Sequence, residues 1–359
     1  MYIEIEETTD LKKWDLELER FEGSIFLSSS WLEEQRNIDK TPVYLYFNVN
    51  KKTKALISGL QRPVGSTSEK QLFFYSGIAT DIHNSDFILY CKKKLLDYAK
   101  KNYFSRIIIK SYDYNDQVKT NISEFKPFKR TECVIDLKVN ESEIINGFTK
   151  RSIKYIRKAK REGATLKYDN NPELLETLFA LMKTTLNTRI SRGYGGYEMF
   201  TMPFLDIEVL KKMLLTKKAY LYYIVFKGEI VSIKLLAIMA GGAYGLYMGT
   251  SPLGYQIAAP SMLIHDTALK LKKDGVSRYN LGGVPLGNKH EGVMQFKLQM
   301  GSTVVNSYEE TTDFLLYPLK RLNKFLKLKR VLMSFYIPWR IKKQLLKIIN
   351  LFLRNRDKY

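Results

Sequence analysis

An internal repeat constrains the fold of this chain more than any other feature of its sequence. The segment "VYLYFNVNKKTKALISGL" (43–60) resembles "AYLYYIVFKGEIVSIKLL" (219–236), and each is typical of an aromatic-rich strand, a short turn and a second strand. The segment "LLDYAKKNYFSRIIIKS" (95–111) resembles "ALKLKKDGVSRYNLGG" (268–283), each the end of an amphipathic helix followed by a strand. Both matches share an offset of about 175 residues, which predicts a tandem duplication.

The duplication predicts an α/β (α+β) protein built from two similar units with mixed central sheets. We expect the units to span residues 1–130 and 131–312, with "EFKPFKRTE" (124–132) as the connector, and a separate tail over 313–359. The second unit has the predicted order β-α-α-β-β-β-α-β-α-β. Its main predicted elements are a strand over 132–138, helices over 141–162, 172–187, 258–273 and 290–299, and strands near 219–226, 230–240, 243–250 and 278–283.

The charge is strongly positive and unevenly spread. With 45% hydrophobic residues the chain can fill real cores, and its net charge of +21 implies an anionic partner or a solvated basic surface. Residues 320–359 hold thirteen Lys and Arg residues against one acid, Asp357, and Pro338 divides them into two amphipathic helices. Such helices are typical of an anchor lying on an anionic membrane, and equally of a helix pair docked on the protein.

Several classes of site are not indicated by the sequence. Cys91 and Cys133 lie far apart without CxxC spacing, which favours free thiols in a reducing compartment, and the three histidines show no metal-ligand spacing. The N-terminus lacks the apolar core of a signal peptide, and no run of about 18 apolar residues occurs. We therefore expect no metal and a cytoplasmic protein, with the tail allowing peripheral attachment to the inner face of the cytoplasmic membrane.

The predicted order resembles the GNAT acyltransferase fold, and two such units in tandem resemble the FemABX family over roughly residues 20 to 310. The basic segment "KRSIKYIRKAKREG" (150–163) is similar to that family's basic helix, and "TRISRGY" (188–194) to its K-R-x-G loop. The segment "GVMQFKLQMGS" (292–302) is similar to its Phe-Lys element, and "FLSSSWLEE" (26–34) to its S-x-x-W segment. The coiled-coil arm of some members is absent, and Asp113 matches the family's Asp-Pro only approximately.

This resemblance implies an acyl- or aminoacyltransferase that forms an amide on an amine of a cell-envelope precursor, lipid-linked or nucleotide-linked. No tightly bound cofactor is implied, because a bound ester or thioester is attacked directly. Aminoacyl-tRNA as donor suits the basic helix, and acyl-CoA suits the arm-less architecture. The alternative is a non-catalytic basic module that binds RNA or an anionic membrane.

Two residues are the candidates for catalysis. Lys297 is predicted on an otherwise apolar helix, where an ammonium group could stabilise developing negative charge, and it matches the Phe-Lys element together with Phe296, a candidate for substrate binding. Tyr247, on a central strand, could position or protonate a leaving group. The competing interpretations are a lysine whose charge reaches solvent from a helix face and a core aromatic residue.

The remaining candidates concern substrate and donor. Arg189, Arg192 and Tyr194 lie in a loop that could hold a diphosphate or sugar, or that simply connects, and Lys154 and Arg157 lie on the basic helix, where a phosphate-rich ligand could bind.

A phosphate of the donor could bind at the start of the helix predicted from residue 258, through its free amides and dipole. Small residues allow close approach of a donor there, and they are Gly249, Thr250, Ala259 and Ser261.

Overall fold

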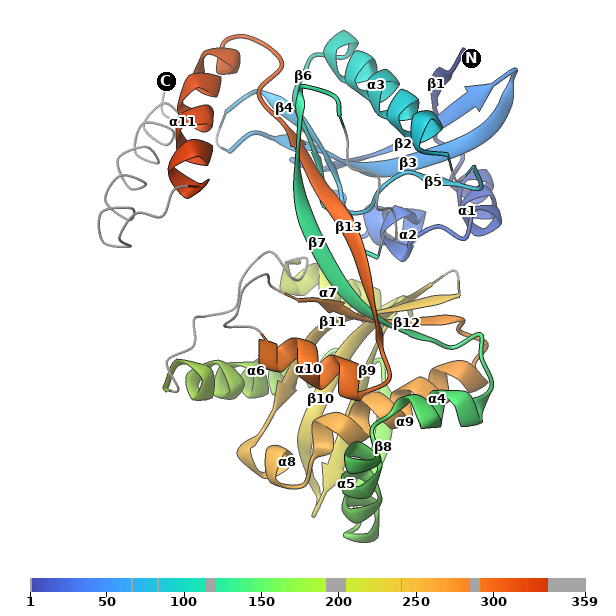
Figure 1. Ribbon diagram of the computed structural model, residues 1–359, viewed down its shortest axis with the longest axis vertical. Coiled ribbons are helices and arrows are strands. Elements are labelled where there is room, and N and C mark those ends of the chain that lie inside the picture. The colour runs from blue at the N-terminus through green and yellow to red at the C-terminus, as the bar shows by residue number, and fades with distance from the viewer. Residues whose placement is uncertain are drawn as a thin grey trace.

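The computed structural model describes residues 2–65, 67–82, 84–113, 121–191, 205–239, 241–284 and 291–334. Two α/β units lie one above the other along the long axis, and two long strands run from one unit into the other (Figure 1). The candidates Arg192 and Tyr194 and the distal part of the tail lie outside the described residues.

The first unit contains most of the large aromatic side chains of the main core. Its elements are β1 (Glu4–Glu7), α1 (Leu11–Arg20), a 3-10 turn (Ile25–Leu27), α2 (Ser29–Glu33), β2 (Thr41–Val49), β3 (Lys52–Pro63), β4 (Lys70–Phe74), β5 (Ala79–Thr80), α3 (Ser85–Lys101) and β6 (Phe104–Ile109).

The second unit repeats this succession with additional helices. Its elements are β7 (Phe125–Asp136), α4 (Glu141–Gly147), α5 (Lys150–Arg161), β8 (Thr165–Asp169), α6 (Leu174–Ser191), α7 (Ile207–Leu215), β9 (Ala219–Phe226), β10 (Glu229–Met239), β11 (Gly242–Thr250), α8 (Pro252–Gln256), α9 (Ala259–Lys273), β12 (Arg278–Gly283), α10 (Glu291–Gln299) and β13 (Thr303–Thr312). A 3-10 turn (Leu319–Leu322) and α11 (Asn323–Ser334) follow.

The sheet confirms two tandem units of similar topology. Its strand order is β1-β2-β3-β4-β6-β13-β7-β12-β11-β10-β9-β8, so the hairpin β2–β3 and the hairpin β9–β10 occupy equivalent places counted from opposite ends. In each half the fourth strand pairs in parallel with the strand that follows the long helix, β4 with β6 and β11 with β12. The two repeated segments therefore mark equivalent structure.

The two strands at the centre of the sheet join its two halves, and the second of them, β13, crosses to the first unit. β7 pairs with β12 of the second unit, whereas β13, the last strand of the described residues, pairs with β6 of the first unit. β7 and β13 pair with each other from Thr303–Val134 to Thr312–Phe125. The segment predicted as the connector, 124–132, is mostly strand, because residues 125–132 form the first part of β7, and the predicted boundary at residue 130 lies inside this strand.

Two apolar cores support the sheet. The larger extends through the first unit and onto one face of the second unit's strands, where α6 and α7 cover it. The smaller lies on the opposite face of the second unit, beneath α4, α5, α9 and α10. Because the larger core runs through both units, it holds them in a fixed relation. Cys91 and Cys133 are buried free thiols, as expected.

Local capping explains where the basic helix begins. The predicted single helix over 141–162 is two helices, because Phe148 leaves the helical conformation and bridges to Met300. The side chain of Thr149 then caps α5 by accepting from the amide of Ser152, and α5 ends before Gly163, whose φ of +92° suits glycine. The sequence interpretation also missed α7, α8 and β8.

The described part of the tail packs on the first unit. The amide of Leu315 donates to the Ser105 carbonyl at 2.7 Å, and Leu322 is buried. The Asn323 side chain both donates to the Phe314 carbonyl and accepts from its amide. Residues 314–322 therefore dock on the first unit, whereas most of the predicted helix pair over 320–359 lies outside the described residues. Among the helices of the described residues, none has the length and apolar character needed to cross a bilayer.

Candidate active site

The candidate site lies where β11 and β12 stop pairing. The two strands pair in parallel over residues 242–244 and 278–280, and this pairing ends before either strand does. Leu246 forms a bulge in β11, because Leu235 pairs with Tyr247 while Leu236 pairs with Gly245. Gly282 adopts a φ of +83°, and a Cβ placed on it would lie 3.3 Å from the Gly245 carbonyl oxygen. Backbone N–H and C=O groups on the facing edges of β11 and β12 are thus left without a strand partner beside Gly245 and Gly282 in the described part of the chain.

Lys297 reaches this point from α10. Its Nζ donates to the carbonyl oxygens of Gly282 at 2.8 Å and Gly283 at 3.0 Å, which leaves one N–H bond for a ligand. Burial lowers the pKa of Lys297 to about 8, partly offset by the carboxylate of Glu132. The residue is therefore mostly protonated at neutral pH and is held at the strand ends by its own hydrogen bonds, rather than extending into solvent.

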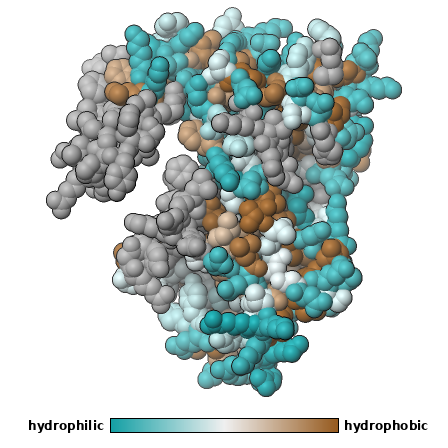
Figure 2. All heavy atoms as spheres, in the orientation of Figure 1, coloured by the Kyte–Doolittle hydropathy of each residue, from teal (hydrophilic) through white to brown (hydrophobic). Residues whose placement is uncertain are grey.

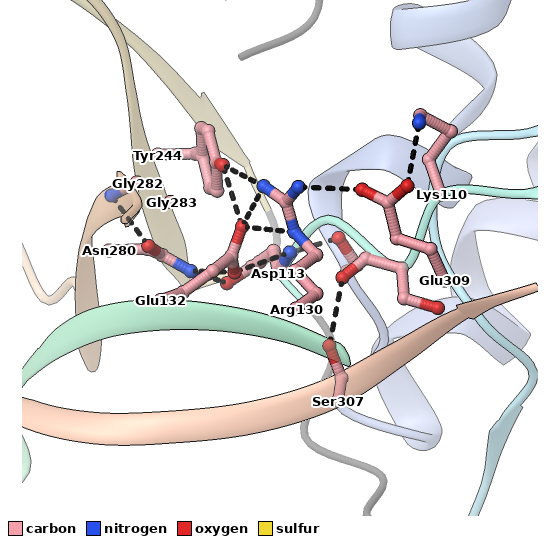
Figure 3. A network of polar contacts seen from close by, with 12 residues as sticks. Lys110, Asp113, Arg130, Glu132, Tyr244, Asn280, Gly282, Gly283, Ser307 and Glu309 are labelled. Atoms are coloured by element: carbon pink, nitrogen blue, oxygen red, sulfur yellow. Dashed lines mark hydrogen bonds and ion pairs between the residues drawn. The ribbon is translucent and has the colours of Figure 1, made fainter. Parts of the chain in front are cut away.

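A buried carboxylate on β7 organises the opposite side of the strand ends (Figure 3). Glu132 Oε1 accepts from Arg130 Nη2 at 2.6 Å, from Arg130 Nε at 3.0 Å and from the Tyr244 hydroxyl at 2.7 Å. Glu132 Oε2 accepts from Asn280 Nδ2 at 2.8 Å and from the Asp113 amide at 2.9 Å. The Asn280 side-chain oxygen in turn accepts from the Gly282 amide at 2.8 Å, so the network fixes the glycine beside Lys297.

The same network joins the two units. Asp113, at the end of the first unit's described chain, accepts from Asn280 at 2.9 Å and from Arg278 at 2.8 Å. Arg130 also donates to Glu309 of β13 at 3.0 Å, and Glu309 accepts from Lys110 at 2.7 Å. The carboxylate of Glu132, with the hydroxyl of Tyr244, raises the pKa of Arg130 despite its burial. The guanidinium therefore stays charged, and the strand ends are held rigidly.

Tyr247 lies on the opposite face of the sheet from α10. Its hydroxyl accepts from the Leu205 amide at 3.1 Å, and its ring belongs to the larger core with that of Phe179. Tyr244 occupies the position at the strand ends, with burial and Glu132 raising its pKa well above the usual value. The structure thus brings Tyr244, and not Tyr247, to the network around Gly282.

The small residues nominated for donor binding are occupied by packing. A Cβ at Gly249 would lie 2.6 Å from the Met182 amide nitrogen, so this glycine lets α6 approach β11. Thr250 is buried, and its amide donates to the Thr185 hydroxyl on α6 at 3.2 Å. Ala259 is fully buried at the start of α9 and Ser261 is partly buried in its first turn.

The substrate-binding candidates lie in different places. Phe296 packs beside the smaller core next to Lys297. Lys154 and Arg157 are exposed on α5, whose capping residue Thr149 donates its amide to the Gln299 carbonyl at 3.1 Å, so the basic helix starts where the helix of Lys297 ends. Hydrophilic residues cover the lower end of the molecule, where α5 lies (Figure 2). Arg189 lies near the end of α6, and its side chain is not among the described ones.

Sequence reasoning missed Arg130, Glu132, Asn280 and a buried lysine, Lys234. The triplet Arg-Thr-Glu at 130–132 could have indicated Arg130 and Glu132, because residues two apart in a strand point to the same face of the sheet. Lys234 stands in the apolar strand "EIVSIKLLAIM", where a lysine is unusual enough to notice. Within the described residues, no cluster of histidine, cysteine or acidic side chains could hold a metal ion.

Comparison with known proteins agrees with this geometry. The family model of the acetyltransferase (GNAT) domain matches residues 148–298. No curated protein matches the chain at a significant level. Among solved structures, FemX superposes with a TM-score of 0.67 at 15% identity, covering 90% of this chain and 99% of that one. A conserved protein of unknown function from Bacteroides thetaiotaomicron has a TM-score of 0.54 at 12% identity, covering 87% of this chain and all of that one.

The fold and the family match thus identify a GNAT-type acetyltransferase domain over residues 148–298. More particularly, the chain has the FemX-like tandem GNAT fold, and the matched domain contains β11, β12 and Lys297.

Proposed function

We propose that this protein transfers an aminoacyl group from a charged tRNA to an amine of a cell-envelope precursor. The observation that carries the proposal is Lys297, an ammonium group held by two backbone carbonyls at the end of β12 with one N–H bond to spare. The amine attacks the ester carbonyl directly, and Lys297 stabilises the negative charge that develops on the carbonyl oxygen.

The basic helix supports tRNA as the donor. Lys154 and Arg157 are exposed on α5, which begins at the end of α10 and so connects an anion-binding face to the helix of Lys297. Nucleic-acid backbones bind such faces through many phosphate contacts, and the binding weakens steeply as salt is raised.

The start of α9 supports the same choice over acyl-CoA. A diphosphate bound at a helix start needs free amides there, but Pro260 supplies no N–H, and α8 stands between β11 and α9. Close packing of Gly249 against α6 leaves no space for a side chain at that point of β11. Acyl-CoA is therefore the second donor to be tested.

The deciding experiment offers the purified chain both donors. Aminoacyl-tRNA or acetyl-CoA is incubated with a nucleotide-linked peptide bearing a free lysine amine, and the amide product is measured by mass spectrometry. We expect product with aminoacyl-tRNA, and product with acetyl-CoA alone would contradict the choice of donor. The absence of product with either donor across amine acceptors would refute the transferase proposal and leave binding of RNA or anionic membrane as the alternative.

A paired variant tests the docking face. Lys154→Glu with Arg157→Glu should raise the KM for the tRNA donor and flatten its salt dependence, while leaving the fold intact because both side chains are exposed. Lys93→Glu, an exposed lysine on α3 of the first unit, is the matched control and should change neither quantity.

A further inference from the structure

Lys234 is a buried lysine at the candidate site whose amino group makes no hydrogen bond within the described residues. The residue is 4% exposed on β10, and within the described parts of the chain no acceptor or carboxylate binds its Nζ. The Nζ lies over the ring of Tyr279, 4.8 Å from its centre. A buried lysine in such surroundings is costly when charged, so its retention needs a reason.

The position of Lys234 connects it to the strand ends. A Cβ placed on Gly245 would lie 2.8 Å from Lys234 Nζ, so the amino group rests directly against the β11 backbone next to the bulge. Gly245 in turn lies beside Gly282, which lies beside Lys297. A Cβ placed on Gly282 would lie 3.3 Å from the Gly245 carbonyl oxygen and 3.9 Å from Lys297 Nζ. Two amino groups therefore flank the place where β11 and β12 stop pairing.

We propose that Lys234 is the proton acceptor of the transfer reaction, with Lys297 as the cation that stabilises the oxyanion. This assignment rests on the proposed function and names the base of that same site. The two lysines thus have different roles because the hydrogen bonds of their amino groups differ: Lys297 makes two and acts as the cation, and Lys234 makes none among the described residues and acts as the base.

The difference between the two lysines follows from their surroundings. Lys297 donates to two carbonyls, which favours its charged form, whereas Lys234 has only an aromatic ring beside it. Burial, with a smaller effect from the charge of Lys297, lowers the pKa of Lys234 to about 7. Near neutral pH a large fraction of Lys234 is thus unprotonated beside a protonated Lys297.

The other groups packed around Lys234 leave Lys297 as the main charge acting on it. Burial raises the pKa of the three tyrosines and of the cysteine among these groups, so they remain neutral, and the carboxylate of Glu132 is engaged by Arg130. The titratable and charged groups on the surrounding elements are Lys297 on α10, Tyr279 on β12, Tyr222 on β9, Tyr244 on β11, Cys133, Glu132 and Arg130 on β7, and His265 and Asp266 on α9.

The proton balance of the step is complete with these groups. The lone pair of the acceptor amine forms the C–N bond, and the carbonyl electrons move to oxygen, where Lys297 stabilises them. The attacking nitrogen then loses a proton to Lys234. When the intermediate collapses, the C–O bond of the ester breaks and the leaving oxygen takes that proton, which restores neutral Lys234 and gives an amide and an alcohol.

The test is the pH dependence of kcat/KM for the full chain with aminoacyl-tRNA. The wild type should gain activity as pH rises through about 7, the pKa of Lys234. Lys234→Met and Lys234→Gln should lose about 10²- to 10⁴-fold in kcat/KM, and their kcat/KM should no longer rise with pH near 7; this rise is the limb of the pH profile assigned to Lys234. Lys297→Met should also lose activity but should move the limb to higher pH, because it removes the charge that lowers the pKa of Lys234. Lys272→Met, a half-buried lysine on α9, is the matched control and should keep the wild-type profile.

A second measurement separates this assignment from the proposed function. Nuclear magnetic resonance of lysines carrying ¹³C at Cε should show one signal, absent from Lys234→Met, that titrates near pH 7. Wild-type kcat/KM with an unchanged limb in Lys234→Met, or a Lys234 signal titrating above pH 10, would overturn the assignment while leaving the transferase intact. A wild type without transfer activity would refute the proposed function and this role together, even if the signal titrates near 7.

Discussion

Replacing Glu132 by glutamine should destabilise the protein more than any comparable change on its surface. Glu132 is 2% exposed, and its two oxygens accept five hydrogen bonds, three on Oε1 and two on Oε2. A glutamine amide group must take the place of one oxygen. Placed at Oε2, it faces two donors, the Asn280 amide group and the Asp113 amide, and it no longer neutralises Arg130.

The magnitude follows from these contacts. Two hydrogen bonds to a charged acceptor are lost, at roughly 1.5–3 kcal/mol each, and removing one partner of a buried ion pair costs about 3–5 kcal/mol. Arg130 keeps its ion pair with Glu309, so the ion-pair cost is not added and we expect the loss of the two hydrogen bonds, about 3–6 kcal/mol in the free energy of unfolding. For a chain of this length that loss corresponds to a fall of about 5 °C in the melting temperature.

Urea denaturation followed by circular dichroism measures this loss, with the midpoint and slope fitted together. Glu309→Gln is the matched control, because Glu309 pairs with Arg130 and Lys110 but its side chain is 15% exposed, and we expect it to cost about 1–2 kcal/mol. Equal losses for the two variants, or a loss under about 1 kcal/mol for Glu132→Gln, would refute the view that Glu132 organises the centre of the sheet.

Four further predictions follow from the site and the tail. Lys297→Met should lower kcat by about 10²- to 10³-fold with partial recovery in Lys297→Arg, while the exposed Lys154→Met should leave chemistry on a saturating donor unchanged; equal rates for Lys297→Met and wild type in single-turnover assays would remove Lys297 from the site. Gly249→Ala should lower the free energy of unfolding in urea by about 1–3 kcal/mol, because its Cβ would meet the Met182 amide nitrogen at 2.6 Å, and an unchanged value would show that α6 can shift freely. The pKa of Lys234 is lower in the folded protein than in the unfolded chain, so between about pH 7 and 10.5 the unfolded chain binds one more proton. The stability of the wild type should therefore rise with pH across this window. A Lys234→Met variant that shows the same rise in thermal melts would contradict this. A chain ending at residue 334 should keep its melting temperature and lose co-sedimentation with anionic vesicles at low salt, whereas undiminished binding would place the membrane contact elsewhere.

The repeat and most elements of the second unit could be predicted from the sequence because they depend on local patterns. The aromatic hairpins at 43–60 and 219–236 keep the alternation of strands, and β9, β10, β11 and β12 lie within one or two residues of their predicted bounds. The crossing of β13 to the first unit could not be predicted in this way. The first half of β7 is charged and contains Pro127, and its partner in β13 lies more than 170 residues further along the chain.

The choice between two tyrosines shows why the site was only partly predictable. Tyr244 and Tyr247 are three residues apart, so a regular strand would place them on opposite faces. The bulge at Leu246 changes this alternation, and both rings belong to the larger core. A bulge of one residue leaves no reliable mark in a single sequence, whereas the Phe-Lys segment of α10 carried enough pattern to nominate Lys297 as a candidate.

The crossing of β13 to the first unit also determines the order in which the chain can complete its structure during synthesis. The edge of β6 meets its neighbour only when residues 310 and 311 have emerged, about 200 residues after β6 itself. Until then the first unit presents an open strand edge, which is a site for pairing with other chains. A nascent chain stalled before residue 303 should therefore bind chaperones or aggregate, although every strand of the first unit has by then been synthesised.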